Sequence, residues 1–147
     1  MKKVVIKVLS FMLAFIIAFG AFGVTANAAN LDKKAKNICK TLKKGKKAGS
    51  IVGKLDVKYE KQGKTYDFTV SLDCHQDASL FGMTAKMVPD KYKESRDSVG
   101  KAYKNIKKII KKGGIKKCNV IYVVKANGVK LWEFKNGKLV FDKYLSE

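Results

Sequence analysis

Residues 36–45 read KNICKTLKKG and residues 104–113 read KNIKKIIKKG, so seven of the ten positions are identical. Both stretches end in Lys-Lys-Gly, which is typical of a helix C-terminus, because lysine suits the negative end of the helix dipole and glycine tolerates a left-handed conformation. A stripe at helical spacing accompanies each copy: Leu31, Ala35, Ile38 and Leu42 in the first, and Tyr92, Arg96, Val99, Tyr103, Ile106 and Ile110 in the second. We therefore predict two amphipathic helices.

A second correspondence indicates that the chain contains an internal repeat. Residues 64–68 read KTYDF and residues 130–134 read KLWEF, at an offset of 66 against 68 for the first pair. Each stretch follows a predicted turn, Gln62-Gly63 or Asn127-Gly128. Asn-Gly is a strong signal for a β-hairpin, because both residues accept a positive φ.

Alternation of apolar and polar residues predicts six strands. The predicted strands are 51–60, 64–74 and 80–88 in the first half of the chain and 118–126, 129–135 and 138–144 in the second. The weakest is 80–88, in which the alternating apolar residues are Phe81, Met83, Ala85 and Met87. The last two strands are joined by a second Asn-Gly turn, Asn136-Gly137.

These elements predict an α+β fold with a tandem αβββ-αβββ pseudo-repeat. Short turns between consecutive strands favour antiparallel meanders, and we expect the two lysine-rich helices to pack on one sheet face. The halves, residues 29–88 and 89–147, are each too small to be stable alone, so we expect them to share one core in a single domain, residues 29–147. The pattern is compatible with one continuous sheet or with two small sheets.

The first 28 residues have the pattern of a secretory signal peptide. Lys2, Lys3 and Lys7 form a positive n-region, a largely apolar run follows, and Ala26-Asn27-Ala28 is an A-x-A cleavage site. We therefore predict cleavage after Ala28 and a secreted, extracellular domain. The short lysine-rich n-region and the preference for lysine over arginine indicate a bacterial protein.

The charge of the chain is concentrated in the two predicted helices. The sequence has 32 Lys and Arg against 12 Asp and Glu, a formal net charge of +20 on 147 residues, and without the three n-region lysines this becomes 29 − 12 = +17. Residues 29–47 carry +7 and residues 101–117 carry +8, so these segments hold +15 of the total. Arg96 is the only arginine. Because arginine is the usual bidentate reader of guanine, this composition argues against a sequence-specific nucleic-acid reader.

Two lysine-rich helices on one sheet face would present a broad positive surface. Because lysines are point charges suited to polyanions, we predict a non-catalytic cationic protein that associates with an anionic polymer or membrane surface, such as cell wall, anionic lipid or glycan. The expected polyanion-binding residues are Lys36, Lys40, Lys43, Lys44, Lys101, Lys104, Lys108 and Lys111.

The alternative function is a secreted protein-binding inhibitor or adaptor that uses a sheet face, with the lysines serving only for solubility. Exposure of Tyr66 and Trp132 on one sheet face would favour this alternative, because aromatic residues are common at the centre of protein interfaces. The two rings are in phase with Phe68 and Phe134, which favours a place in the core.

Cysteine and histidine are the only candidates for catalytic or metal chemistry. Cys39, Cys74 and Cys118 fall on predicted core faces, so we expect either one disulfide with a buried thiol or three buried thiols. A zinc site that adds His75, the single histidine, is not expected, because no CxxC spacing is present. Adjacent residues such as Cys74 and His75 point to opposite faces of a strand, which disfavours a nucleophile and base pair. We therefore predict no enzyme activity, no metal and no cofactor.

Overall fold

The structure is a computed structural model that describes residues 30–44 and 53–145. Its elements in chain order are the helix α2 (Leu31–Lys44), the strands β1 (Gly53–Gln62) and β2 (Thr65–Cys74), the helices α4 (Ala78–Met87), α5 (Pro89–Gly100) and α6 (Tyr103–Lys112), and the strands β3 (Cys118–Ala126), β4 (Val129–Lys135) and β5 (Lys138–Asp142). The fold is therefore α+β, as predicted. The predicted signal peptide, residues 1–28, lies outside the described residues.

The five strands form one continuous sheet in the order β1-β2-β3-β4-β5. Neighbouring strands are antiparallel except for β2 and β3, which are parallel, so the sheet is mixed and the prediction of a purely antiparallel sheet is wrong. The connections explain the difference. Strands joined by a tight turn must reverse direction, whereas three helices separate β2 from β3 and allow the chain to return before β3 begins.

The prediction of a strand at 80–88 is wrong, because residues 80–87 belong to the helix α4 and Val88 is its C-cap. Phe81 and Ala85, which are four residues apart, are both buried. A spacing of four satisfies both the strand period of two and the helix period of about 3.6, so this alternation does not distinguish the two structures. The side chain of Asp77 caps the helix by accepting a hydrogen bond from the backbone N–H of Ser79 at 2.9 Å.

The second predicted helix is divided into α5 and α6 by a turn at Lys101 and Ala102. Its stripe still faces the core, since five of the six members are buried and Tyr103 is partly buried. Gly100 stands directly before the turn and lies against the ring of Phe134, where a Cβ would come within 2.6 Å of Cε1. Because glycine is a weak helix former, the residue that permits this close contact also favours the break between α5 and α6.

The predicted tight turns join the hairpins at the expected positions. Gly63 has a φ of 61° in the turn between β1 and β2. Asn127 and Gly128 have φ values of 47° and 81° between β3 and β4, and Asn136 and Gly137 have values of 50° and 82° between β4 and β5. Positive φ at both central residues matches the twist of the flanking strands, which is why Asn-Gly selects a two-residue hairpin turn.

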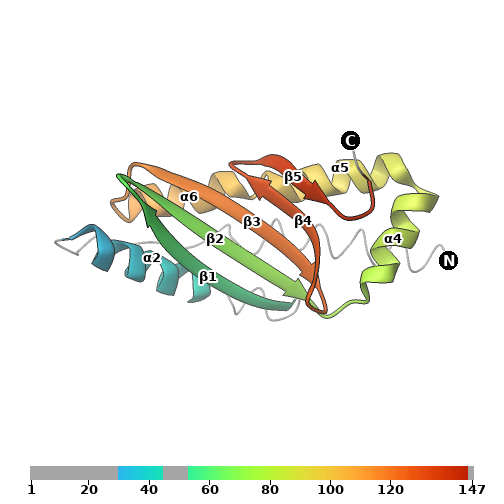
Figure 1. The fold of residues 1–147 in the computed structure, drawn as a ribbon, viewed down its shortest axis with the longest axis horizontal. Helices are drawn as coiled ribbons and strands as arrows, with labels where there is room; N and C mark the ends of the chain where they lie inside the picture. The colour runs from blue at the N-terminus through green and yellow to red at the C-terminus, as the bar shows by residue number, and fades with distance from the viewer. Residues whose placement is uncertain (1–29, 45–52, 146–147) are drawn as a thin grey trace.

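The helices cover one face of the sheet. In Figure 1, α2, α5 and α6 lie behind the sheet and α4 stands at one end of it. The side chains that face these helices are in register across the strands, so that Val70 lies between Val57 on β1 and Tyr122 on β3. All three are buried in the single hydrophobic core. The opposite face, which we call the open face, carries no helix of the described residues.

The segments α2-β1-β2 and α6-β3-β4 share an order of elements but not a geometry. Both step across the sheet in the same direction, and both helices pack on the same face. However, β1 and β3 run in opposite directions, because β1 is antiparallel to β2 and β2 is parallel to β3. The two segments are therefore of opposite hand and cannot be superposed. The predicted αβββ-αβββ layout is not the layout of the structure.

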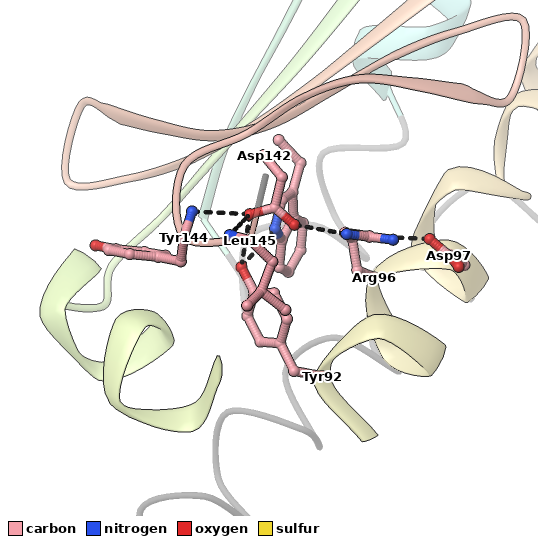
Figure 2. A network of polar contacts seen from close by, with 7 residues as sticks. Tyr92, Arg96, Asp97, Asp142, Tyr144 and Leu145 are labelled. Carbon is pink, nitrogen blue, oxygen red and sulfur yellow. Dashed lines mark hydrogen bonds and ion pairs between the residues drawn. The ribbon is translucent and has the colours of Figure 1, made fainter. Parts of the chain in front are cut away.

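A buried ion pair joins α5 to the end of β5 (Figure 2). Nη1 of Arg96 donates to Oδ2 of Asp142 at 2.8 Å, and both side chains are only 2% exposed. The other carboxylate oxygen of Asp142 accepts hydrogen bonds from the backbone N–H groups two and three residues further along the chain. Trp132 donates its indole N–H to the hydroxyl of Tyr92 at 2.7 Å, beside this pair. The only arginine of the chain therefore lies in the core and is not available to an external ligand.

Candidate functional site

The candidate site consists of the exposed lysines on α2 and α6. Ile106, Ile109 and Ile110 are buried on the sheet side of α6, so the lysines between them turn to solvent. The eight predicted polyanion-binding residues are all exposed: Lys36, Lys40, Lys43, Lys44, Lys101, Lys104, Lys108 and Lys111. Within residues 30–44 and 53–145, no carboxylate forms an ion pair with a lysine of α6.

The helix α2 lies against the C-terminal end of α6 through a glycine. A Cβ on Gly113 would lie 2.4 Å from Cγ1 of Ile38, so this close approach requires a residue without a side chain. The side chain of Lys34 lies over the next residue, Gly114, which has a φ of 96°. The glycine that ends α6 is therefore also the contact point between the two helices.

The predicted lysines form two groups rather than one cluster. Lys34 and Ile38 face α6, whereas Lys36, Lys40 and Lys43 lie on the other side of α2 and face β1. The second group is exposed on α6 and on the turn before it, and consists of Lys101, Lys104, Lys108 and Lys111. Lys44 is exposed at the end of α2 and belongs to neither group.

A groove of about 430 Å³ runs between α2 and β1, and we call it the basic groove. Four lysines line it: Lys36, Lys40 and Lys43 in a row on the helix, and Lys58 on the edge strand. The floor is formed by Cys39, Val57 and Tyr59. The ring of Tyr59 is partly buried and packs with its centroid 6.1 Å from the ring of Phe68. The groove thus combines positively charged walls with a largely apolar floor.

One carboxylate, that of Asp56, lies next to the basic groove. Its two oxygens are 3.7 Å from Nζ of Lys43 and 3.7 Å from Nζ of Lys58. These side chains are 45% to 80% exposed, so in water the ion pairs hold the lysines only weakly. Lys36 and Lys40 have no ion-pair partner in the part of the chain that the structure describes. The four lysines and one aspartate give the groove a net charge of 4 − 1 = +3.

A smaller cavity of about 240 Å³ lies where the start of α2 meets the loop after α6. Three exposed lysines line it, namely Lys64, Lys116 and Lys117. The ring of Tyr66 forms part of its wall and donates a hydrogen bond from its hydroxyl to Asp32 at 2.8 Å. The positive surface therefore continues around the N-terminal end of α2.

The three cysteines are free and buried, and they are distributed over three elements. Across the β2–β3 ladder Cys118 pairs with Tyr66 and Cys74 pairs with Ala126, so eight residues of strand separate the two cysteines, or about 26 Å. That separation rules out a disulfide between them. Burial raises the pKa of the Cys39 and Cys74 thiols to about 11. Such thiols are weak nucleophiles and poor metal ligands at neutral pH.

The remaining candidates for chemistry do not assemble into a site. His75 is exposed in the loop after β2. Among the described residues, no group of three or more His, Cys, Asp or Glu side chains could hold a metal ion. Tyr66 is 2% exposed and Trp132 is fully buried, so the pair of exposed rings that would favour a protein-binding face is absent.

Sequence reasoning missed the contribution of β1 to the site. Lys58 belongs to a strand whose segment is neutral overall, and nothing in its neighbours marks it as part of a basic groove. Lys64, Lys116 and Lys117 were missed for the same reason, because their proximity depends on how the loops meet. Helical periodicity identifies the faces of α2, but it does not reveal which strand lies beside each face.

Comparisons with known proteins give no relative: no protein-family model, no curated protein and no solved structure matches the chain. In the described part of the chain, none of the helices combines the length and the apolar character needed to cross a bilayer.

Proposed function

We propose that this is a secreted, non-catalytic cationic protein that associates with anionic surfaces or polymers through the lysines of α2 and α6. The observation that carries the proposal is the density of exposed lysines on α2 and α6, of which only Lys43 forms an ion pair within the described residues. Residues 101–117 contain eight lysines and no acid, and residues 31–44 contain six lysines and one acid. Structural ion pairing does not account for such a concentration.

The proposed mode of binding is electrostatic and independent of sequence in the polymer. Each lysine that neutralises an anionic group releases condensed counterions, and this release supplies most of the affinity. Because Arg96 is buried in an ion pair, the surface offers no guanidinium for bidentate recognition of a base or a carboxylate. The binding should therefore be strong at low salt and weak at high salt.

The proposed location is outside the cytoplasmic membrane of a bacterium, after removal of residues 1–28. The order of charged n-region, apolar run and Ala-Asn-Ala motif supports this location. The anionic partners in that location include cell-wall polymers, lipid headgroups and acidic glycans. We further propose that the similarity between residues 36–45 and 104–113 reflects a shared role as cationic helices and not a repeat of the whole layout.

A second candidate function, a protein-binding inhibitor or adaptor, is favoured by the open face of the sheet. Phe141 is 39% exposed, and its ring lies 4.6 Å from Nζ of Lys130. Ile121 on β3 is partly buried on the same face. The open face is mixed in charge, so its partner would be a protein with a complementary polar surface.

Retention on immobilised heparin at about 0.15 M salt tests the first proposal. The variant to compare with the wild type replaces four lysines of the second group by glutamine: Lys101, Lys104, Lys108 and Lys111. The matched control removes the same charge at exposed lysines on α4, α5 and β5: Lys86, Lys91, Lys93 and Lys138. We expect the first variant to elute at clearly lower salt than the control. Equal elution of the two variants would show that net charge alone causes retention and would contradict the proposal.

A further inference from the structure

The basic groove places three of its cations in a row along α2. Lys36 and Lys40 are one helical turn apart, about 6 Å along the axis of α2, and Lys43 continues the row. Lys58 lines the groove from the edge strand β1, where it alternates with Val57 and Tyr59 and its side chain is 80% exposed. Beside the row lies a largely apolar floor. This arrangement suits a linear ligand that carries anions at short, regular intervals and uncharged carbon groups between them.

The kind of cation in the groove indicates the kind of anion. An ammonium group is a compact point charge that binds phosphate without a fixed planar geometry. The cations of the groove are all lysines, and Arg96 is buried elsewhere. Phosphate is therefore a suitable anion for this groove.

The floor of the groove indicates what lies between the phosphates. Binding of single-stranded nucleic acid uses exposed aromatic rings on which the bases stack. Tyr59 is the only aromatic residue of the groove, and its ring packs against Tyr66 and Phe68. Val57 and Cys39 offer apolar atoms suited to aliphatic carbons. We propose that the basic groove is a binding site for a linear polyol phosphate, such as a glycerol phosphate chain. This inference rests on the proposed function and specifies its ligand.

Asp56 offers a second test of the proposal, because removal of a carboxylate beside the groove should strengthen the binding of a phosphate polymer. Its carboxylate lies at the edge of the groove, 3.7 Å from Nζ of Lys43 and 3.7 Å from Nζ of Lys58, and would repel a bound phosphate. Removal of this charge by Asp56→Asn frees both lysines. We therefore expect the variant to bind the polymer about twofold more tightly or better, because one nearby like charge is removed.

The experiment is a calorimetric titration of the full secreted domain with a short glycerol phosphate oligomer. The test variant is Lys36→Gln/Lys40→Gln, and the control is Lys33→Gln/Lys54→Gln, which removes the same charge from α2 and β1 outside the groove. We expect the test variant to bind about fivefold more weakly or worse and the control to stay within about twofold of the wild type. Equal weakening of both variants would overturn the proposal, as would unchanged binding in Asp56→Asn.

A second titration with an oligonucleotide of equal phosphate number distinguishes the two kinds of phosphate polymer. Weaker binding of the oligonucleotide supports the proposal, and equal or tighter binding overturns the choice of a polyol phosphate. Heparin retention of the α6 variant, described above, is independent of the groove. Loss of the groove effect with retention intact would therefore reject this inference alone, whereas loss of the retention difference would reject the proposed function.

Discussion

At the scale of single residues, Arg96 shows how a buried charge can serve a fold that otherwise exposes its cations. The sequence places it in a stripe of apolar residues, where an arginine is out of character. In the structure its guanidinium lies between Asp142, which is buried, and Asp97, whose side chain is 56% exposed. The buried partner joins the end of β5 and the two residues Tyr144 and Leu145 to α5, because its second oxygen accepts a backbone hydrogen bond from each of them.

Replacement of Arg96 or of Asp97 tests how much each of the two ion pairs contributes to the free energy of unfolding. Arg96→Met leaves the carboxylate of Asp142 buried without its cation, and we expect a loss of about 3–5 kcal/mol in the free energy of unfolding. Asp97→Asn removes only the exposed partner and should cost less than about 1 kcal/mol. Urea denaturation of both variants measures the difference. Similar costs for the two changes would show that the buried pair does not stabilise the fold.

The cysteines lead to a prediction about reactivity and pH. Burial raises the pKa of the Cys39 and Cys74 thiols to about 11, so at about pH 8 only one thiol in a thousand is ionised in the folded protein. We expect alkylation by iodoacetamide to be slow in the native protein and fast in denaturant. In the unfolded protein the thiols lose their protons near the ordinary pKa of 9.0, whereas in the folded protein burial keeps them protonated up to about pH 11. The contribution of the buried thiols to folding stability is therefore complete below about pH 9 and is lost as the pH rises through 11. Equal alkylation rates in the native and unfolded protein would contradict this.

At the scale of elements, the contact between α2 and α6 holds the two lysine-rich helices together. Gly113 has a φ of −70° in the structure, a value that alanine also adopts readily. Without a neighbouring helix, Gly113→Ala should therefore stabilise the protein by roughly 0.5–1 kcal/mol. The contact with Ile38 reverses the sign, because the added Cβ would lie 2.4 Å from Cγ1.

We therefore expect Gly113→Ala to lower the free energy of unfolding by about 1–3 kcal/mol. The thermal or urea unfolding transition measures this change. An alanine variant as stable as the wild type, or more stable, would show that α2 does not pack on α6 as described.

Elements with a strong local signal were predictable from the sequence, and those that depend on long-range contacts were not. The Asn-Gly turns fixed two hairpins correctly, because their positive φ values belong to the residues themselves. The strand predicted at 80–88 was wrong, because the spacing of Phe81 and Ala85 fits both the strand period and the helix period. The parallel pairing of β2 and β3 was not predicted for the same reason, because a helix in place of a strand changes the connection between them. The basic groove needs Lys58 beside α2, which no local pattern specifies.

At the scale of the whole molecule, the charges are divided between the two sides of the sheet. The helix side carries the lysines of α2 and α6. The open face carries five of the carboxylates, at alternate positions of the strands: Asp56, Glu60, Asp67, Asp73 and Glu133. The helix side is thus cationic, whereas the open face is mixed in charge.

The salt dependence of polyanion binding tests this account most directly. The affinity for a long glycerol phosphate polymer is measured over a range of salt concentrations for the wild type, the four-lysine α6 variant and the matched four-lysine control. The slope of log K against log salt reports how many anionic groups the protein neutralises, and each lost contact lowers it by about 1. We predict a much shallower slope for the α6 variant and a slope close to that of the wild type for the control. Equal slopes for the two variants would contradict the claim that the helix lysines, rather than the net charge, bind the polymer.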